Sequence, residues 1–250
     1  ELALALYHGV ISELVPVSSS RAAEAAKLTE NIFRSVNIAM VNELKVIFDK
    51  MDIDVWDVIN AAKTKPFGFM PFYPGPGLGG HCIPIDPFYL TWKARQHGVE
   101  TRFIELAGEI NTHMPHYVVA RMDEALQIQG KQGLRGARVL MLGMAYKKNI
   151  DDMRESPALV LTELIEEAGA ACVYHDPYVD EIPMTREHAA LAGRASVALS
   201  DDEIAKADCV VIVTDHDNVD YAQVGAKAAL IVDTRNAMAG HDAACAVVKA

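Results

Sequence analysis

The stretch Ala137-Arg138-Val139-Leu140-Met141-Leu142-Gly143 sets the architecture of the second half of the chain. From Val139 to Leu142 its side chains are apolar without interruption. An unbroken apolar run is typical of a strand covered on both faces, as in a parallel sheet. We therefore predict a parallel sheet in which this stretch is one of the buried strands.

Helices and strands alternate along the chain after this stretch. Ser156 is suited to cap a helix that has Pro157 at its first position, and Gly169 is a good signal for the end of that helix. The sequence Ser200-Asp201-Asp202-Glu203 has the pattern of a capping box. Further strands are predicted over 171–174, 209–214 and 230–233. This alternation predicts an α/β fold with a Rossmann-like parallel sheet.

The carboxyl edge of this sheet is the expected ligand site, because ligands of open α/β sheets bind where the strands end. Gly143, Thr214 and Arg235 should lie at that edge. The formal net charge of −11 disfavours nucleic acid or an anionic membrane as a partner. An anionic nucleotide can still bind where a few cations and backbone amides converge.

The first half of the chain is predicted to be helical. The serines at 18–20 offer N-caps for a long helix, since 21–51 contains neither proline nor glycine. Apolar residues recur there at helical spacing, at Ile32, Val36, Ala39, Met40, Leu44 and Ile47. Further helices are predicted over 55–62, 87–96 and 103–126. Such a block is suited to forming a homodimer, and a plain helical subdomain is the alternative.

Composition places the chain among ordinary globular proteins. Its 250 residues are 51% hydrophobic and 23% charged, enough for one or two domains with a core. No apolar run approaches 18 residues and no segment has a signal-peptide pattern, so no membrane partner is expected. The cysteines show neither a C-x-x-C pair nor metal-ligand spacing, which favours a reducing cytoplasm and no metal. They are Cys82, Cys172, Cys209 and Cys245.

The segment Gly75-Pro76-Gly77-Leu78-Gly79-Gly80-His81-Cys82-Ile83-Pro84-Ile85-Asp86-Pro87 carries the chemistry-bearing pattern. It contains the letters G-x-G-x-x-G, but no strand precedes them and prolines follow, so we reject a dinucleotide fingerprint. A cysteine ends the glycine run and a carboxylate comes four residues later. This arrangement indicates covalent catalysis on a small anionic molecule. A surface loop with an incidental cysteine is the alternative.

Three ordered motifs carry a resemblance to a known family. They are residues 75–90, Ala26-Lys27-Leu28-Thr29-Glu30-Asn31, and the segment 145–157, which reads AYKKNIDDMRESP. Together they resemble the nucleotide-sugar 6-dehydrogenases, which include UDP-glucose and UDP-N-acetylhexosamine dehydrogenases. The wording GGHCIPIDP is similar to the branch that acts on UDP-N-acetylamino sugars. The UDP-glucose branch usually has serine at the position of His81.

The resemblance implies a domain plan. Residues 1–18 correspond to the end of an N-terminal NAD-binding domain, 19–130 to a helical dimerisation domain with the cysteine loop, and 131–250 to a UDP-sugar-binding Rossmann-like domain. No convincing G-x-G-x-x-G follows a strand in this chain. We therefore expect the chain to be the last two-thirds of a longer enzyme, with the NAD site mostly outside it.

The resemblance also implies an activity and its residues. The enzyme would oxidise a UDP-N-acetylhexosamine, with UDP-N-acetylglucosamine favoured, twice at C6 with NAD. The product would be the uronate, a polysaccharide precursor, formed through a cysteine thiohemiacetal and thioester. The residues implied are Cys82, Asp86, Lys27 and Asn31 for catalysis, Gly79, Gly80, Lys147 and Arg235 for substrate binding, and Arg154 for the cofactor.

Spacing alone leaves other interpretations open. Lys27 and Asn31 share one helix face, which without the resemblance favours a solvated surface. The cations Lys147, Arg154 and Arg235 could be ordinary surface charge. UDP-glucose is an alternative substrate. A non-catalytic UDP-binding and dimerisation module, or a hydrolase using Cys82 with a histidine such as His81 or His113, are alternatives of other classes.

Overall fold

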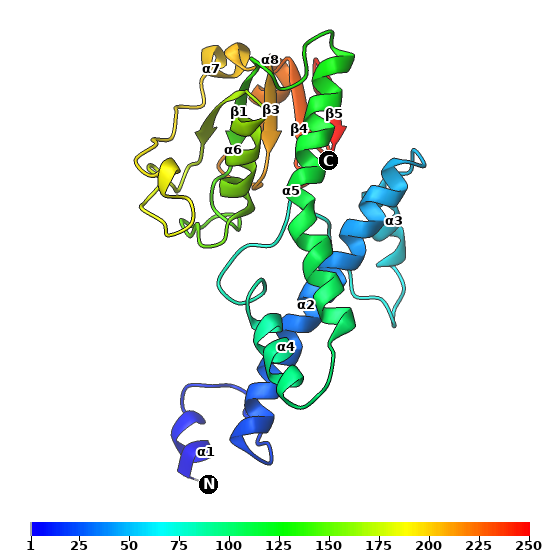
Figure 1. Ribbon diagram of the computed structural model, residues 1–250, viewed down its shortest axis with the longest axis vertical. Helices are drawn as coiled ribbons and strands as arrows, with labels where there is room; N and C mark the ends of the chain where they lie inside the picture. The colour runs from blue at the N-terminus through cyan, green and yellow to red at the C-terminus, as the bar shows by residue number, and fades with distance from the viewer. Residues whose placement is uncertain (1) are drawn as a thin grey trace.

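The computed structural model describes residues 2–250, which form a helical region and an α/β region (Figure 1). The helical region contains α1 (Leu2–Tyr7), α2 (Ser20–Asp49), α3 (Val55–Ala62), α4 (Asp86–Gln96) and α5 (Arg102–Ile128). The two long helices, α2 and α5, pack against each other and form its centre. The side chain of Ser19 caps α2 by accepting the N–H of Ala22, so the predicted serine cap is confirmed.

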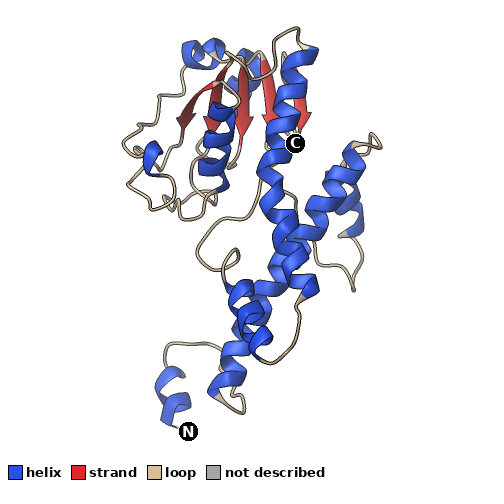
Figure 2. Cartoon of the chain, in the orientation of Figure 1, coloured by secondary structure: helices blue, strands red, loops and turns tan. Residues whose placement is uncertain are grey.

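The α/β region is built on a five-stranded sheet in which all strands are parallel (Figure 2). Its strands are β1 (Arg138–Leu142), β2 (Ala171–His175), β3 (Cys209–Ile212), β4 (Leu230–Asp233) and β5 (Ala246–Lys249), in the order β2-β1-β3-β4-β5. The helices of this region are α6 (Pro157–Glu167), α7 (Asp201–Lys206) and α8 (Tyr221–Lys227). The predicted α/β class is confirmed.

The apolar run of β1 is buried on both faces of the sheet, as predicted. Val139 and Met141 belong to a core that includes residues of α5 and α6. Leu140 and Leu142 belong to a second core with residues of α7 and α8. Successive strand residues point to opposite faces, so an unbroken apolar sequence supplies both layers.

The helix α5 takes part in both regions. Its first half packs on α2, whereas Val118, Met122 and Leu126 lie in the core beneath the sheet. A second connection joins α2 to the sheet edge, where the Nζ of Lys45 donates to the carbonyl of Lys249 at 2.8 Å. The boundary at 130/131 stays a prediction, although the core of the sheet includes residues that precede it.

Two features differ from what the sequence patterns predict. Ser200 accepts the N–H of Glu203 as a capping box requires, but the Glu203 carboxylate pairs with Arg138 rather than turning back to Ser200. The reciprocal half of the box is therefore wrong, since a guanidinium within reach is the stronger partner for the carboxylate. The edge strand β5 was not predicted, because it is four residues long and only half-buried.

Candidate active site

The cysteine loop, residues 74–85, lies between the helical region and the carboxyl edge of the sheet. From the helical side, the side chain of Asn42 accepts the N–H of Gly75 at 3.0 Å. From the sheet side, the carbonyl of Arg154 accepts the N–H of Gly80 at 2.9 Å. The loop is thus held by both regions, and its geometry depends on how they pack.

The glycines of this loop permit close contact with the sheet domain. A Cβ on Gly79 would lie 2.5 Å from the Cβ of Tyr146, and a Cβ on Gly80 would lie 2.8 Å from the ring of Tyr146. Gly80 also has a positive φ of +87°, which other residues rarely adopt. A Cβ on Gly75 would lie 2.5 Å from the guanidinium of Arg235. Gly79 and Gly80, which are predicted to contact the substrate, therefore pack against Tyr146.

The structure brings Cys82, Asp86 and Asn31 together. Cys82 is an exposed free thiol, and its carbonyl accepts the N–H of Asp86 at 2.8 Å, so one turn separates them at the start of α4. The Asp86 carboxylate accepts a hydrogen bond of 2.6 Å from the buried Asn31 side chain of α2. A nucleophile, a carboxylate and an amide that orients the carboxylate thus occupy one site.

Lys27 lies one turn before Asn31 on α2 but turns to solvent. Its Nζ is 3.5 Å from the Glu30 carboxylate, and both side chains are more than half exposed. The two residues of the predicted pair therefore have different partners. Asn31 donates to the Asp86 carboxylate, and Lys27 lies near Glu30 at the surface. A rotation of the long lysine side chain is required to bring its ammonium toward the site.

Arg154 presents an exposed fork at the sheet side of the loop. Its Nε and Nη2 donate to the two Asp152 oxygens at 3.0 and 2.6 Å, and this pairing holds the pKa of Asp152 below its usual value. Arg154 and His81 line an open cleft of about 580 Å³ that Arg186 also reaches. Both arginines belong to the α/β region, and four carboxylates line the same cleft, those of Asp151, Asp152, Glu155 and Glu187.

Lys147 and Arg235 both lie at the carboxyl edge of the sheet. Lys147 is exposed in the loop after β1, and Arg235 follows β4 with its Nε donating to the carbonyl of Val213 at 2.8 Å. Burial lowers the pKa of Arg235, and Asp215 and Asp233 oppose this effect. The predicted positions of Gly143, Thr214 and Arg235 at the ends of β1, β3 and β4 are confirmed.

A dinucleotide does not fit the first turn after β1. Such a ligand needs free backbone amides at a helix N-terminus directly after the strand. Here the N–H groups of Met144 and Ala145 donate to the Asp176 carboxylate, at 2.6 and 3.0 Å. The next helix, α6, begins only at Pro157 and is capped by the Ser156 side chain. The turn after β1 therefore has no free backbone amides to hold a dinucleotide phosphate.

A chain of buried polar side chains behind the loop was missed by sequence reasoning. Asn42, which holds Gly75, donates to the Asn111 side chain at 2.9 Å, and Asn111 donates to the carbonyl of Ser35 at 3.0 Å. Asn31, Ser35 and Asn42 are all buried on α2. Their spacing of four and seven residues on one helix face was the available signal.

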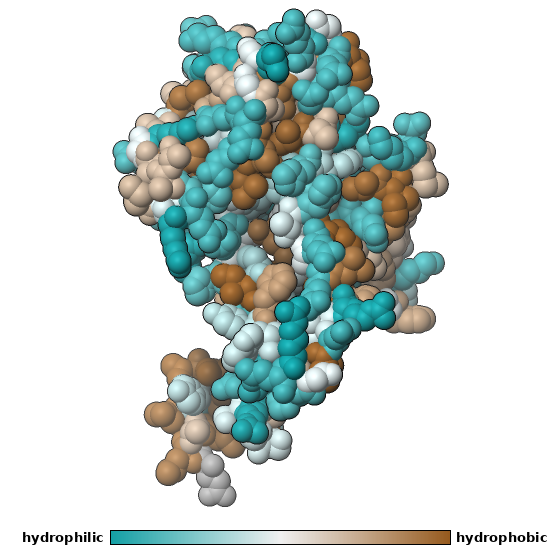
Figure 3. All heavy atoms as spheres, in the orientation of Figure 1, coloured by the Kyte–Doolittle hydropathy of each residue, from teal (hydrophilic) through white to brown (hydrophobic). Residues whose placement is uncertain are grey.

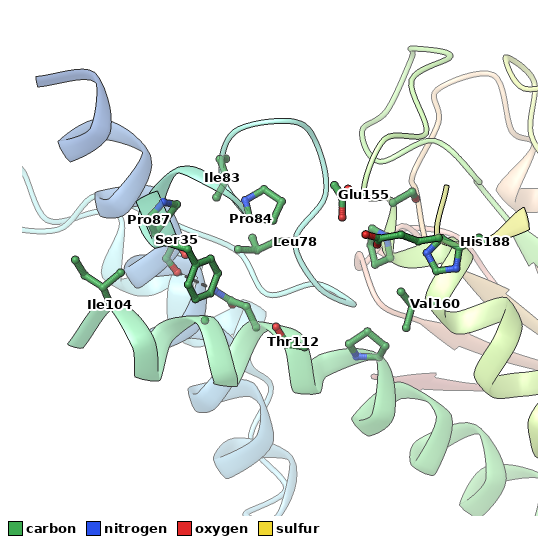
Figure 4. A pocket seen from close by; sticks show the side chains of 17 residues that line it. Ser35, Leu78, Ile83, Pro84, Pro87, Ile104, Thr112, Glu155, Val160 and His188 are labelled. Atoms are coloured by element: carbon green, nitrogen blue, oxygen red, sulfur yellow. Dashed lines mark hydrogen bonds between the residues drawn. The ribbon is translucent and has the colours of Figure 1, made fainter. Parts of the chain in front are cut away.

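A cavity of about 230 Å³ lies behind the loop, between α4, α5 and α6 (Figure 4). Leu78, Ile83 and Pro84 of the loop face it, with Ser35 and Val160 among the other lining residues. Cys82 and Asp86 do not line this cavity. The exposed thiol of Cys82 is therefore open to a ligand from outside this cavity.

Within residues 2–250, no three His, Cys, Asp or Glu side chains are grouped closely enough to hold a metal ion. Over the same residues, no helix combines the length and the apolar character that crossing a membrane requires. Apolar side chains do reach the surface over α1 and parts of the helical region (Figure 3). On α1, Leu2 and Leu6 are 89% and 72% exposed.

Comparison with known proteins defines the class. The model of the UDP-glucose/GDP-mannose dehydrogenase family, central domain, matches residues 21–113. The model of the UDP binding domain of the same family matches residues 140–240. A helical central domain followed by a UDP-binding sheet is thus the arrangement of nucleotide-sugar dehydrogenases. The chain belongs to the UDP-glucose/GDP-mannose dehydrogenase family, which confirms the resemblance found in its motifs.

Individual relatives are similar over most of the chain. The UDP-N-acetyl-D-mannosamine dehydrogenase of Escherichia coli K12 is 38% identical over 206 residues, covering 80% of this chain and 46% of that protein. The NDP-N-acetyl-D-galactosaminuronic acid dehydrogenase of Ralstonia nicotianae is 35% identical over 217 residues, covering 86% and 48%.

The solved structure of the UDP-D-ManNAc dehydrogenase from Pyrococcus horikoshii superimposes with a TM-score of 0.84 at 30% identity. The match covers 99% of this chain and 56% of that one. The chain thus spans about half the length of the relatives it matches. The activities in the names of these relatives are those of the whole relatives.

Proposed function

We propose that the whole protein to which this chain belongs oxidises a UDP-N-acetylhexosamine twice at C6, giving the uronate. The observation that carries this proposal is the hydrogen bond from Asn31 to the Asp86 carboxylate, one turn from the exposed Cys82 thiol. NAD+ is the proposed hydride acceptor and binds mostly outside this chain, with Arg154 as the proposed contact from within it. An exposed thiol that must stay reduced is consistent with a cytoplasmic enzyme.

The residues of this chain account for the covalent half of the reaction. After the first oxidation, the Cys82 thiolate adds to the C6 aldehyde and forms a thiohemiacetal. Loss of a second hydride from C6 converts this adduct to a thioester. Water then attacks the thioester carbon while Asp86 takes up one of its protons, and the C–S bond breaks to release the carboxylic acid and the thiolate. The acid then loses its remaining proton to solvent and becomes the carboxylate.

Asn31 and Lys27 have distinct proposed parts in this chemistry. Asn31 keeps the Asp86 carboxylate oriented. Lys27, released from Glu30, stabilises the oxyanion that develops at C6. Changing Lys27 to Ala in the whole protein should therefore lower kcat much more than it raises KM, by about 2.7–4 kcal/mol in transition-state stabilisation. An effect confined to KM assigns Lys27 to substrate binding instead.

The nucleotide is proposed to bind at the carboxyl edge of the sheet. Lys147 and Arg235 supply cations there. The backbone of Gly79 and Gly80, which lie against Tyr146, is the proposed contact to the sugar. The loop wording favours UDP-N-acetylglucosamine, whereas the names of relatives include N-acetylmannosamine and N-acetylgalactosaminuronic acid. The epimer depends on pocket geometry, and UDP-glucose is the alternative outside the amino-sugar class.

A homodimer is the proposed assembly. Phe33, Met40 and Ile47 recur every seven residues on α2 and are 45–46% exposed. Leu106 of α5 is 53% exposed and lines the same hollow as Ile47. A second copy of the helical region covers this apolar surface in the proposed dimer. Light scattering on the whole protein measures the assembly, and a monomer at all concentrations contradicts it.

NADH formation is the test of the activity. The whole protein, given NAD+ and a panel of the three UDP-N-acetylhexosamine epimers with UDP-glucose, should reduce two NAD+ per sugar oxidised. The 250-residue chain alone should bind UDP but reduce no NAD+, because the nicotinamide has no site in its sheet. Sustained turnover by the chain alone overturns this assignment, and UDP binding without turnover by the whole protein favours the non-catalytic module.

A further inference from the structure

A buried, hydrogen-bonded pair of side chains, Asp176 and His216, lies beneath the loop that follows β1. Asp176 follows β2 and His216 follows β3, so the two residues flank the end of β1, which lies between these two strands. The Asp176 Oδ2 and His216 Nε2 atoms are 3.0 Å apart, and neither side chain has any exposed surface. None of the proposed catalytic steps uses this pair.

The Asp176 carboxylate accepts hydrogen bonds from four backbone N–H groups. Oδ2 accepts the N–H groups of Met144 and Ala145, and Oδ1 accepts those of Tyr178 and Val179 at 2.8 and 3.1 Å. Burial by itself raises the pKa of Asp176, but these donors, with His216 first among them, hold the pKa below its usual value. The carboxylate therefore stays ionised and fixes the start of the loop.

His216 extends this anchor to the far end of the loop. Its Nδ1 accepts the backbone N–H of Asn149 at 2.9 Å, so that nitrogen carries no proton. The proton on Nε2 then donates to Asp176, which fixes one neutral tautomer. The remaining neighbours are the Tyr178 ring at 5.1 Å and the Tyr221 hydroxyl, which donates to the carbonyl of His216.

The loop is tied at both ends and leaves one cation free between them. Asn149 has a positive φ of +63°, and its side chain exchanges two hydrogen bonds with Asp217, which also pairs with Lys148 at 2.9 Å. Lys147 is exposed, and no hydrogen bond or ion pair within residues 2–250 engages its ammonium. It stands at the β1/β3 switch point, where ligands of such sheets bind.

We propose that the Asp176–His216 pair positions Lys147 for the diphosphate of the nucleotide, so that His216 is a positioning residue for substrate binding. This inference rests on the proposed function only in naming the nucleotide-sugar as ligand. The physical claim is that a buried anion and a neutral imidazole set the path of residues 144–149. The lysine is then already placed when the diphosphate arrives, and binding does not have to order the loop.

Kinetics of the whole protein test this role. His216→Leu removes both the donor and the acceptor and should raise KM for the UDP-sugar about tenfold, with kcat and KM for NAD+ within about twofold. His216→Gln keeps one amide donor and one carbonyl acceptor and should recover most of the loss. The matched control is His175→Gln, since that ring lies beside Asp176 but bonds the carbonyl of Val197. It should leave KM unchanged.

A double-mutant cycle separates positioning from a merely structural role. If His216 acts through Lys147, His216→Leu should lower UDP affinity in the native background and add no further loss in a Lys147→Ala background. Calorimetry with UDP alone reads this without turnover, so it stands apart from whether the sugar is oxidised. Equal losses in both backgrounds, or a fall in kcat with KM unchanged, overturn the proposal.

Each variant must first be shown to fold, and a surface variant replaces the buried one if the latter does not. Circular dichroism and thermal unfolding establish whether each His216 variant is native. If His216→Leu does not fold, Asp217→Ala keeps the test, because Asp217 is exposed and holds Asn149 from the outer side. It should raise KM for the UDP-sugar about threefold. An unchanged KM shows that the path of this loop does not govern binding and overturns the inference.

Discussion

The sheet and the helix α2 bury opposite kinds of side chain. In the sheet, β1, β3 and β4 place apolar residues on both faces, and Leu140 and Val210 are fully buried. On α2, Asn31 and Asn42 are buried, whereas Met40 is 45% exposed. The core of one region is apolar, whereas the buried residues of α2 are mostly polar: Asn31, Ser35, Asn42 and Lys45, beside Ala39 and Val41.

This difference separates what stabilises the protein from what shapes its site. Apolar burial is non-directional and supplies most of the folding free energy. Buried amides add little net stability, but they must meet specific partners, so they fix geometry. Asn31 holds Asp86 and Asn42 holds Gly75. The inner face of α2 is therefore a scaffold for the cysteine loop, and its outer apolar stripe is exposed.

The largest expected effect comes from exchanging a thiol in each region. Cys82→Ser in the whole protein should abolish uronate formation, because an alkoxide is far harder to form than a thiolate. Its thermal stability should stay unchanged, since Cys82 is exposed. Cys209→Ser, fully buried in β3, should instead lower stability with the chemistry retained. Product analysis and thermal unfolding read the two outcomes, and uronate from Cys82→Ser sinks the covalent mechanism.

A methyl group in the loop should have the next largest effect. Gly79→Ala places a Cβ 2.5 Å from Tyr146 and 3.0 Å from the carbonyl of Glu155. The loop must shift, and a displacement of the reacting group by about 1 Å costs on the order of 100-fold in rate. Gly9→Ala is the control, because nothing lies within 4 Å of its added Cβ. Equal activity of the two variants contradicts a clamped loop.

Truncating one buried residue in each region sharpens the contrast. Leu140→Ala should cost about 2–5 kcal/mol of unfolding free energy, with kcat preserved in the folded fraction. Asn42→Ala should cost about 1–3 kcal/mol, since Asn111 and the N–H of Gly75 lose their partner, and kcat should fall as well. Denaturant unfolding with steady-state kinetics measures both. Unchanged kcat in Asn42→Ala removes the scaffold role from α2.

The smallest effect is expected on the solvated face of α2. Glu30→Gln breaks the ion pair with Lys27. The side chains of Glu30 and Lys27 are 58% and 59% exposed. Exposed ion pairs contribute less than about 1 kcal/mol, so the unfolding midpoint should hardly move. Denaturant titration beside the native protein checks this. A loss of unfolding free energy comparable to that of Asn42→Ala means that both faces of the helix contribute to stability.

The elements that sequence predicted best are those with a local cause. The serine cap of α2, the bounds of α3 and the strand β1 follow from capping, spacing and an unbroken apolar run. The class of the sheet follows from alternation alone. The edge strand β5 has no such signal, because it is four residues long and only half-buried.

The candidate site likewise contains residues that the sequence motifs identified and supporting residues that they did not. Motif resemblance selected Cys82, Asp86 and Asn31, and the structure places them together. The supports escaped detection, because Asn42, Asn111 and Tyr146 act across 33 or more residues of chain in the contacts described above. Periodicity reports which face of a helix is polar, but it does not report which distant backbone that face will bind.

The sharing of α5 between the two regions has a consequence for how the protein comes apart. One continuous helix of 27 residues lies on α2 at one end and supplies Val118, Met122 and Leu126 to the sheet at the other. Fraying at either end therefore weakens packing at both, so melting is cooperative across the two regions. A cut at residue 130 would strip the sheet of one of its covering layers. The chain is two regions in architecture and a single unit in unfolding.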